Sequence, residues 1–581
     1  MTVDLSQIVE NPMELDAGSV WTLLKHKDIA YTEGREAERY LERVLAECTD
    51  LSSASPELEA RMIDWSSEYH LTSKRGHLLR GLQFDRAKTV LEVGCGCGAI
   101  TRFLGETFDQ VVSVEGTLAR ARLARMRTRD LDSVSILSAP FQEIKFKQKF
   151  DIIFCIGVFE YSASFVKAED PYRAVLAYFA DLLKPGGQVV LAIENQFGLK
   201  YFAGEPEDHT NRAYEGIVGY PRSAHFIRTF GYRELKHLLE SYFGSASFLF
   251  PYPDYKTPSA VLAEELFSRV QAGELVGSLQ TRTCRSEKLP VFDAGLACAE
   301  LDRNSALPFF ANSFLVVAGG QGSAPLGEGV LGVLFNTDRL PPYQTKTQII
   351  VAENGEVTTE KTHFRSGREG IKQQLKLRAT SDRWQSGPSL QRVISLRLRQ
   401  PGQTLDTVLG PCRAWLNKLR ATGQSEGGEV VVGGELIDCT WSNSFVSAND
   451  CTIIDQEWAW PEKIELHVLV IRAIYHFLDV PGFDPGVHPA LKAKSRRQQI
   501  QLMAESIGVR LESAQFEEFM ELESQFYNAI DGRSLRRKRL MLELSLRSRT
   551  GLALAMWAWR LPDRVQTYCR RIWRAIKRRI H

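Results

Sequence analysis

The chain has 581 residues, more than a single hydrophobic core usually serves, so we expect two or more domains. Hydrophobic residues make up 44% and charged residues 25%, which excludes a disordered or low-complexity protein. The formal net charge of +1 hides an uneven distribution. Residues 532–581 hold 15 Lys and Arg against two acids, a local net charge of +13, while the rest sums to −12.

The chain shows no signal for export or membrane insertion. Its first residues, MTVDLSQIVENPMELD, carry acids where a signal peptide has a basic segment, and no apolar run reaches membrane-spanning length. The ten cysteines lack both the dense spacing of a disulfide framework and paired CxxC ligands. We therefore expect a protein of the reducing cytoplasm.

Short apolar runs alternate with helical stretches from residue 88 onward. The runs are KTVLEVG, QVVSVEG, VSILSAP, KFDIIFCIG and GQVVLAIE. Strands that alternate with helices predict a parallel sheet with crossover helices, which is an α/β fold of the Rossmann-like kind. We place this domain at residues 61–320 and expect residues 1–60 to form a mostly helical extension.

A candidate nucleotide site lies in LEVGCGCGAITRFL, where Gly94, Gly96 and Gly98 stand between a strand and a helix. Glycine permits unusual dihedrals and lets backbone amides approach a ligand closely. Glu115 ends the next strand, about twenty residues on, where a carboxylate can accept hydrogen bonds from both ribose hydroxyls. Glycine turns also occur for packing alone, and dehydrogenases use a related one.

Two further features favour a methyltransferase over a dehydrogenase: Glu92 just before the glycines, and the KPGG turn at 184–187. Here the sequence resembles the class I S-adenosylmethionine-dependent methyltransferases, whose motif E/DxGxGxG is matched by residues 92–98. The resemblance implies that the glycines line the amino-acid end of the cofactor and that Glu115 holds its ribose. The implied cofactor-binding residues are Glu92, Gly94, Gly96, Gly98, Glu115, Phe141 and Gln142, the last two flanking the adenine.

Two other segments fit the same site. Residues 155–160, within FCIGVFEY, would lie beneath the reacting methyl group, although core packing is the alternative for Cys155 and Phe159. Tyr69 and Arg75, in the polar and aromatic segment 68–80, are expected to close over the cofactor. A solvated helix face is the alternative account of that segment.

The acceptor is expected to bind the segment ENQFGLKYFAGEPEDHTNRAYEGIVGYP at 194–221. Methyl transfer is an in-line displacement in which the enzyme mainly aligns the reactants. A sugar hydroxyl also needs a base, whereas a phosphate oxygen is already anionic. His209 is the candidate catalytic base, and a loop histidine bonded to a neighbouring acid is the alternative. The other polar candidates in the segment are Glu194, Asn195, Lys200, Glu207 and Asp208.

A second domain is expected at residues 326–530, with a kinase-like α+β fold. In residues 435–460, Asp438 is followed five positions later by Asn443, and Asp455 comes twelve positions further on, after a hairpin. Protein and small-molecule kinases use this arrangement: the first Asp orients the acceptor hydroxyl, and the Asn and second Asp bind magnesium. Asp438 is therefore a candidate catalytic residue, and Asn443 and Asp455 are candidate metal ligands.

The region upstream completes the kinase order. Lys361 on a strand fits the lysine that binds ATP phosphates, with Glu369 as its ion-pair partner, and residues 401–409 fit the hinge between two lobes. There are departures: no GxGxxG phosphate loop is visible, Leu436 and Ile437 replace the usual His-Arg or His-Gly, and Gln456 and Glu457 replace Phe-Gly. An active phosphotransferase using ATP and Mg²⁺, a kinase-like fold without catalysis, and coincidence all stay open.

The basic tail at residues 531–581 mixes Arg and Lys with Trp557, Trp559 and Trp573. Such a segment predicts an amphipathic helix at an anionic membrane surface, on the inner face of the cytoplasmic membrane. RNA and a partner protein are alternatives. Since no RNA-binding module accompanies the tail, no nucleic-acid partner is expected.

Methyltransferase, kinase-like domain and basic tail, in this order, resemble the bifunctional enzymes that cap the non-reducing end of bacterial O-antigen polysaccharides. The motifs that carry the resemblance are ENQFGLKYFAGEPEDH, NSFLVVA, LIDCTWSN and IDQEWAW. It implies a lipid-linked polysaccharide acceptor, chain termination by methyl or phosphate on the terminal sugar, and a glycosyltransferase or polymerase partner. The oligomeric state stays open, with a homo-oligomer as one alternative. Two alternatives are a methyltransferase whose second domain only binds glycan or polymerase, and a membrane-bound scaffold in which catalysis is secondary.

Overall fold

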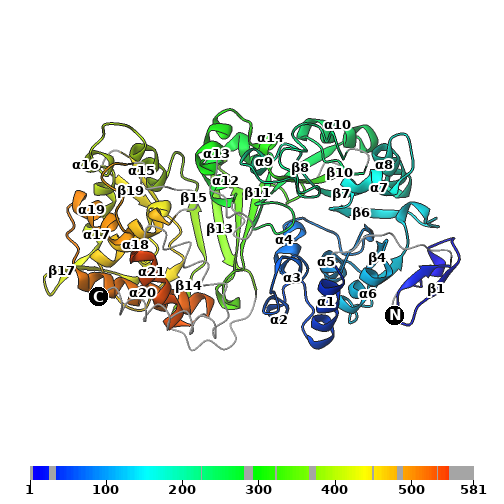
Figure 1. Cartoon of the computed structure of the whole chain (residues 1–581), viewed down its shortest axis with the longest axis horizontal. Coiled ribbons are helices and arrows are strands. Elements are labelled where there is room, and N and C mark those ends of the chain that lie inside the picture. The colour runs from blue at the N-terminus through cyan, green and yellow to red at the C-terminus, as the bar shows by residue number, and fades with distance from the viewer. Residues whose placement is uncertain are drawn as a thin grey trace. The chain divides into compact units, whose positions relative to one another are not determined.

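The computed structural model describes residues 4–24, 34–223, 226–280, 292–320, 324–365, 375–447, 450–479, 488–532 and 534–547. The chain divides into two compact units (Figure 1). The first comprises Met1–Thr337 with Thr345–Glu360, and the second Asp338–Gln344 with Lys361–His581.

Five parallel strands form the centre of the first unit, in the order β5-β4-β3-β6-β7. Their interior positions are buried, as expected of strands covered on both faces. Chain order reverses at β3, and this reversal is the place where open α/β sheets bind ligands beyond the carboxyl ends of their strands. The strands are β3 (Thr89–Val93), β4 (Gln110–Glu115), β5 (Val134–Ser138), β6 (Phe150–Ile156) and β7 (Leu183–Glu194).

Helices cover the two faces of this parallel sheet. Figure 1 shows α5 and α6 on one side of the strands, and α8 and α10 on the other. The helices are α5 (Ala99–Thr107), α6 (Leu118–Arg127), α8 (Pro171–Leu182) and α10 (Tyr232–Phe243). The alternation predicted from the sequence, a Rossmann-like α/β fold, is confirmed.

Antiparallel strands extend the sheet beyond β7. β10 pairs with both β7 and β8, β8 pairs with β9, and β9 pairs with β11, which pairs with β12. The strands are β8 (Ala246–Tyr252), β9 (Ala260–Ala263), β10 (Ser313–Gly319), β11 (Val330–Asn336) and β12 (Thr345–Val351). The helices between them are α11 (Leu266–Arg269), α12 (Gly273–Leu279), α13 (Ala294–Arg303) and α14 (Leu307–Phe310).

The N-terminal residues add both strands and helices. β1 (Met13–Leu15) forms a hairpin with β2 (Trp21–Leu23), and β2 pairs in parallel with β5. The region is thus less helical than expected, and its hairpin belongs to the sheet of the first unit. The helices α1 (Arg35–Glu47), α2 (Pro56–Glu59), α3 (Trp65–Leu71) and α4 (Lys74–Arg80) follow.

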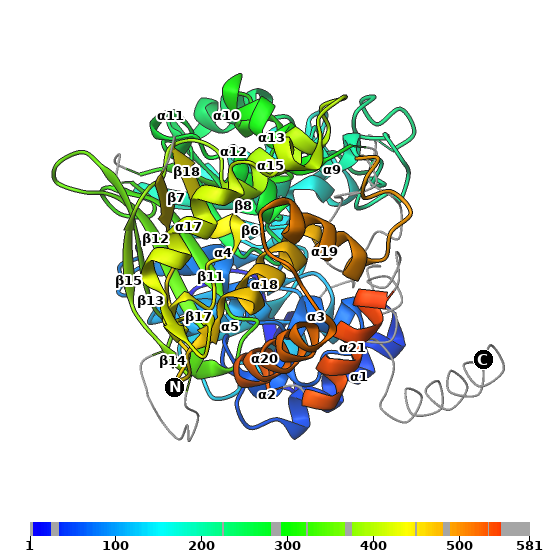
Figure 2. The same cartoon turned by 90° about the vertical axis from the view of Figure 1, so that its left-hand side faces the viewer.

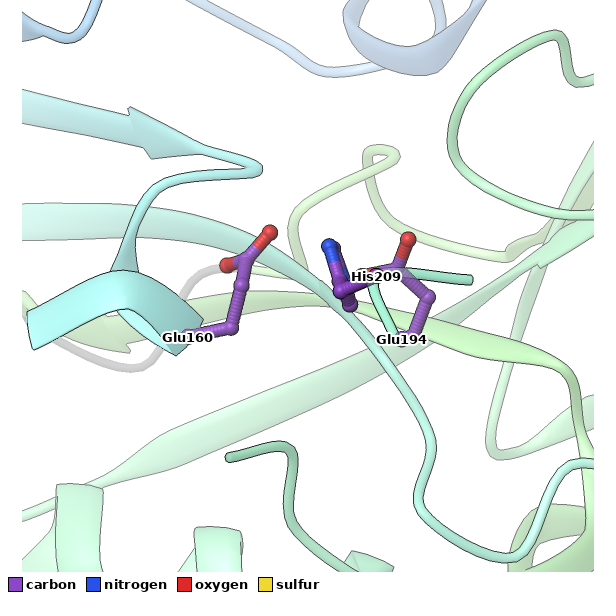
Figure 3. Close-up of side chains that lie close together, drawn as sticks. All are labelled: Glu160, Glu194 and His209. Atoms are coloured by element: carbon purple, nitrogen blue, oxygen red, sulfur yellow. Dashed lines mark ion pairs between the residues drawn. The ribbon is translucent and has the colours of Figure 1, made fainter. Parts of the chain in front are cut away.

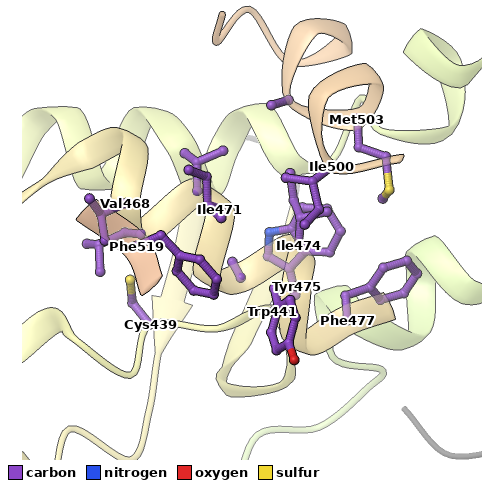
Figure 4. Packing of buried hydrophobic residues seen from close by; sticks show 14 of the residues in the cluster. Cys439, Trp441, Val468, Ile471, Ile474, Tyr475, Phe477, Ile500, Met503 and Phe519 are labelled. Carbon is purple, nitrogen blue, oxygen red and sulfur yellow. The ribbon is translucent and has the colours of Figure 1, made fainter. Parts of the chain in front are cut away.

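The second unit is built around a bundle of helices. α18 (Leu466–Leu478) packs on α19 (Arg496–Ser506) and α20 (Ser513–Asp531), and α20 packs on α21 (Leu535–Arg547), as Figure 2 shows. Their apolar faces enclose a core that includes Trp441, Ile474 and Phe519 (Figure 4). The remaining helices are α15 (Leu390–Leu398), α16 (Leu405–Val408) and α17 (Cys412–Thr422).

Short strands surround the candidate kinase motif. β18 (Ser444–Ser447) and β19 (Asp450–Ile453) pair antiparallel, so the hairpin between Asn443 and Asp455 is confirmed. β17 (Glu429–Val432) pairs with β16 (Gln424–Glu426) and β21 (Ile464–Glu465), and β14 (Lys376–Leu377) with β20 (Trp458–Ala459). β13 (Val357–His363) carries Lys361 and is followed in the order of the large sheet by β15 (Thr380–Arg383).

Two boundaries differ from those expected. β11 and β12, which we assigned to a second domain beginning at residue 326, pair with the sheet of the first unit. α21, which we assigned to the basic tail, buries Leu542 and Leu546 in the second unit, where Ser545 lies 3.0 Å from the hydroxyl of Tyr475. Residues 548–581 lie outside the described part of the chain. Within that part, no helix combines the length and the apolar character needed to cross a bilayer.

Candidate active site

A pocket of about 440 Å³ lies in the first unit, at the carboxyl ends of β3, β4 and β6. The glycine loop is on its wall together with the segment that we assigned to the acceptor. Of the predicted cofactor and acceptor residues, the lining includes Tyr69, Arg75, Glu92, Gly94, Gly96, Glu115, Phe141, Glu160, Asp208 and His209.

The glycine loop has a backbone that only glycine fits. Gly94 has a φ of +77°, and a Cβ there would collide with Cγ2 of Val158. Gly98 has a φ of +85° and begins α5, and its Cβ would lie 2.7 Å from Cα of Ala124 in α6. Gly98 is not part of the pocket wall, and the close approach of α6 requires a glycine at this position.

Glu115 connects the loop to the next strand. Its carboxylate accepts hydrogen bonds from the backbone amides of Gly96, at 2.8 Å, and Thr117, at 3.2 Å. The side chain is buried at the end of β4 and contributes to the pocket wall. A carboxylate fixed in this way is oriented before a ligand binds.

Glu92 is buried in β3 and accepts a 2.7 Å hydrogen bond from the hydroxyl of Ser113. Burial raises the pKa of Glu92 to about 7, although the bond from Ser113 acts in the opposite direction. Glu92 is therefore a neutral or partly charged neighbour of the loop at physiological pH.

Tyr69 and Arg75 both reach the pocket from helices α3 and α4. The guanidinium of Arg75 lies 4.3 Å from the centre of the Tyr69 ring and donates to the carbonyl of Lys256 at 2.9 Å. Arg75 is buried, so the alternative of a solvated helix face does not apply to it. Phe141 lines the pocket, whereas Gln142 is outside its lining and donates to the carbonyl of Phe165 at 3.1 Å.

The segment after β6 divides between core and pocket. Cys155 is buried in β6 and is not part of the pocket wall, and Phe159 packs against Tyr172 and Phe230. Glu160 has no exposed surface and lines the pocket. Burial raises the pKa of Glu160 above its usual range, and the negative charge of Glu194 acts in the same direction.

His209 lies between acids at the other end of the pocket. Its Nδ1 is 2.7 Å from the hydroxyl of Tyr161, and its Nε2 is 3.2 Å from Oε2 of Glu194. Burial lowers the pKa of His209, but the charges of Glu194 and Glu160 outweigh this effect and raise it to about 9. His209 is therefore a cation at neutral pH.

Further ion pairs surround the acids next to His209. Nζ of Lys256 lies 2.5 Å from Oε1 of Glu194 and 2.8 Å from Oδ1 of Asp208. Asp208 also pairs with Lys200 and accepts a 2.7 Å hydrogen bond from Tyr201. Lys256 was not among the predicted residues, because it follows β8, far along the chain, and no local motif marks it.

The other acceptor candidates have structural roles. The side-chain amide of Asn195 donates to the carbonyls of Phe309 and Ala311, at 2.8 and 2.7 Å. Glu207 accepts hydrogen bonds from the amides of His209 and Thr210, at 2.9 and 2.7 Å. The contacts of Glu207 shape the loop that carries His209, whereas those of Asn195 attach the end of β7 to the end of α14 and the residue after it.

In the second unit, four of the predicted kinase residues form two pairs, Lys361 with Asp455 and Asn443 with Asp438. Lys361 forms an ion pair with Asp455 and lies 2.8 Å from Glu457, which also pairs with Arg339 at 2.8 Å. Asp455 has a φ of +59°, a conformation rare for a residue with a side chain. Asn443 donates to the carbonyl of Asp438 at 3.0 Å. Glu369, the expected partner of Lys361, lies outside the described residues.

We expected Asp438 to orient an acceptor hydroxyl, but its carboxylate forms an ion pair with a buried arginine. Oδ1 of Asp438 lies 2.9 Å from the guanidinium of Arg472, which also pairs with the fully buried Glu523 at 2.8 Å. A pocket of about 310 Å³ in this unit includes Leu436 and Gln456 in its lining. Lys361, Asp438 and Asp455 are outside that lining.

Residues 91–191 match the family model of a methyltransferase domain. These residues are a methyltransferase domain. The match begins in β3 and ends in β7, so it contains the glycine loop, Glu115 and Glu160. The class I fold that the resemblance implied is present in the first unit.

Two curated relatives are similar to part of the chain. A ubiquinone biosynthesis O-methyltransferase of Hydrogenovibrio crunogenus is 25% identical over 136 residues, which are 23% of this chain and 54% of that protein. A protein of the same name from Pseudomonas paraeruginosa is 30% identical over 112 residues, which are 19% of this chain and 45% of that protein. The chain thus spans about half the length of the curated relatives it matches.

Among solved structures, the N-methyltransferase NodS from Bradyrhizobium japonicum, in complex with S-adenosyl-L-homocysteine, is 20% identical to the chain. The match covers 28% of this chain and 74% of NodS, with a TM-score of 0.20.

Proposed function

We propose that the first unit transfers a methyl group from S-adenosylmethionine to an oxygen atom of an acceptor. The observation that carries this proposal is a single pocket with two different ends. One end holds the glycine loop and Glu115, and the other holds the buried charges of Glu160, Asp208 and His209. The methyltransferase domain match includes the first end, and the names of the two curated relatives suggest an oxygen acceptor.

The glycine end fits the methyl donor. The backbone at Gly94 and Gly96 faces the pocket without side chains, and the carboxylate of Glu115 is fixed beside it by the amide of Gly96. The pocket volume of about 440 Å³ falls in the usual range for small-molecule sites. When bound there, S-adenosylmethionine supplies a methyl group on a sulfonium, which an acceptor oxygen attacks in line.

The chain's own residues align this attack. Glu115 would accept hydrogen bonds from the ribose hydroxyls, and the loop amides would hold the amino-acid end. Glu160 and His209 would lie beside the acceptor oxygen. If that oxygen is a hydroxyl, its proton must be removed, and a cationic His209 is not a base at neutral pH.

The proposed acceptor is the terminal sugar of a lipopolysaccharide O-antigen chain, whose modification ends elongation. The support is the resemblance of the motifs at 194–209, 312–318, 436–443 and 454–460. The test is mass spectrometry of a synthetic O-antigen oligosaccharide incubated with S-adenosylmethionine. A mass gain of one methyl group is expected, and an unchanged acceptor would contradict the proposed substrate.

A second function, phosphoryl transfer by the second unit, is favoured by one observation. Lys361 and Asp455, 94 residues apart, form an ion pair, and Asn443 contacts Asp438. These are the four residues that a kinase uses for the ATP phosphates, the metal and the acceptor hydroxyl. The second unit would thus add phosphate before methylation, with Asn443 and Asp455 as the Mg²⁺ ligands.

The same assay tests this function when ATP and Mg²⁺ are added. A mass gain of phosphate that is lost in Asp455→Ala supports an active kinase. Methyl transfer that is indifferent to ATP and to Asp455→Ala supports the alternative, in which the second unit only binds glycan or polymerase. Conversely, if the wild type transfers γ-phosphate to the acceptor and Asp438→Ala does not, a second unit that only binds glycan or polymerase would be excluded.

The proposed location is the inner face of the cytoplasmic membrane, close to the lipid-linked acceptor. Residues 548–581 support it through their sequence alone, with nine Lys and Arg, one Asp and three Trp. Basic residues near an anionic surface contribute about 1 kcal/mol each. Homo-oligomerisation and a polymerase partner are further parts of this proposal.

A further inference from the structure

The strongest feature that the proposed methyl transfer leaves unused is the geometry of Glu160, Glu194 and His209. One ligand atom from each, a carboxylate oxygen or an imidazole nitrogen, lies within 4.8 Å of the other two. Figure 3 shows Glu160 and Glu194 on the two sides of His209. Glu160 follows β6, Glu194 ends the neighbouring β7, and His209 comes from the loop beyond, so secondary structure fixes two of the three.

Glu160 points to a missing ligand. Both of its carboxylate oxygens are buried, and no group among the described residues hydrogen-bonds to either of them. A buried carboxylate without a partner is costly, and native proteins usually satisfy such a group with a donor, a water or a metal ion. Since Glu160 lines the pocket, the missing group enters from there.

The positions of Oε2 of Glu194 and Nε2 of His209 also suit the binding of a cation. Lys256 lies 2.5 Å from Oε1 of Glu194, whereas Oε2 of the same carboxylate lies 3.2 Å from Nε2 of His209. Ligand atoms about 2.1 Å from one metal ion lie roughly 3–4 Å from each other. The distance from Oε2 to Nε2 is in this range, and the two carboxylates exclude an anion.

We propose that Glu160, Glu194 and His209 bind a divalent metal ion at the acceptor end of the pocket. Two carboxylate oxygens and one imidazole nitrogen suit first-row ions such as Mn²⁺ or Zn²⁺. Three protein ligands leave further coordination positions open toward the pocket, as in catalytic rather than structural metal sites.

The metal ion would also promote loss of the acceptor's proton, the role for which we expected a catalytic base. A hydroxyl bound to a divalent ion loses its proton more easily, and the ion holds the resulting oxygen anion in place. This role rests on the proposed methyl transfer, whereas metal binding itself does not. Metal ligands must be unprotonated, so the ion displaces the proton from Nε2 of His209 to solvent when it binds. In this account His209 is a metal ligand and not the general base that we expected.

The test measures binding of Mn²⁺ to the full-length protein by electron paramagnetic resonance, without nucleotide. Glu160→Gln removes one ligand charge and should weaken binding at least tenfold, and Glu194→Gln should do the same. The control is Glu518→Gln in the second unit, where Glu465, His467 and Glu518 form another cluster of possible ligands, two of them substantially exposed. Glu518→Gln should retain the pocket's Mn²⁺.

Binding of S-adenosylhomocysteine, measured by calorimetry on the same variants, separates folding from metal binding. The inference holds if Glu160→Gln binds this nucleoside normally and loses Mn²⁺. It is overturned if wild type binds no Mn²⁺, or if Glu160→Gln and wild type bind it equally. If Mn²⁺ binds as expected but S-adenosylhomocysteine does not bind to wild type, the proposed function fails while the metal site stands.

Discussion

The backbone amide of Gly96 donates a 2.8 Å hydrogen bond to Oε2 of Glu115, which joins the loop after β3 to the end of β4. The bond explains why a glycine turn and an acid in the next strand occur together. The turn presents its amides to the pocket, and one of those amides fixes the carboxylate that faces the same space.

Replacing Glu115 by alanine should weaken binding of S-adenosylhomocysteine by about 10–100-fold, because hydrogen bonds to a charged group contribute about 1.5–3 kcal/mol. Isothermal titration calorimetry measures this directly. Glu143→Ala, in the short helix η2 (Phe141–Glu143) and with an exposed side chain, is the control and should bind normally. Equal affinities for the two variants would exclude Glu115 from the binding site.

Gly98→Ala should lower the thermal stability of the first unit by more than Gly186→Ala. Both glycines have a positive φ, +85° and +76°, so both variants incur backbone strain. Only at Gly98 does the new Cβ meet a neighbour, Cα of Ala124 at 2.7 Å, which should add about 1–3 kcal/mol. Scanning calorimetry compares the two, and equal losses would mean that α5 and α6 are not in close contact at Gly98.

The free energy of unfolding of Glu92→Gln, relative to that of the wild type, should increase as pH rises. Burial raises the pKa of Glu92 from 4.5 to about 7, so between these values the folded carboxyl keeps a proton that the unfolded one has lost. The first unit therefore loses up to about 3 kcal/mol of folding free energy as pH rises through this window. Glutamine does not titrate and removes this loss.

The measurement for Glu92 is the difference in urea midpoint between variant and wild type. It should favour the variant more at about pH 8 than at about pH 5. A difference that does not change with pH would show that the pKa of Glu92 is close to its usual value.

Replacing Arg472 by methionine should destabilise the second unit by about 3–5 kcal/mol, since it removes the guanidinium from Asp438 and leaves the buried Glu523 with His476 alone, at 2.7 Å. Arg539, whose side chain is 44% exposed, pairs with Glu517 and Glu521 and provides the control. Arg539→Ala should cost about 0–1 kcal/mol. Urea unfolding compares them, and similar costs would contradict the buried ion pairs.

Truncation after Arg547 removes nine Lys and Arg and one Asp, a net charge of +8, and leaves α21 in place. Binding to vesicles that contain anionic lipid should be lost in the truncated protein and should weaken with salt in the full chain. Sedimentation with vesicles measures both effects. Full-length protein that stays bound at high salt and is released only by detergent would contradict the electrostatic account.

The methyl-donor end of the pocket was predictable because its residues are close in sequence. Gly94, Gly96 and Glu115 lie at the ends of two consecutive strands, so a local motif and one strand spacing were enough. Gln142 shows the limit of this reasoning, because one position beyond Phe141 the side chain turns out of the pocket.

The acceptor end depends on contacts that no local pattern encodes. Glu160 meets His209 and Glu194 because β6 and β7 are neighbours, and Lys256 joins them through β8. The hairpin of β1 and β2 was missed for a related reason. Strands of three residues show too little alternation to be distinguished from a loop.

The central claim is that one pocket brings the methyl donor and an acceptor oxygen together. Its most direct test is mass spectrometry of an O-antigen oligosaccharide incubated with S-adenosylmethionine and either wild-type protein or Gly96→Asp. We predict a mass gain of one methyl group with wild type and none with Gly96→Asp, whose side chain would occupy the loop beside Arg120 and repel Glu115. Equal methylation by both proteins would contradict the account.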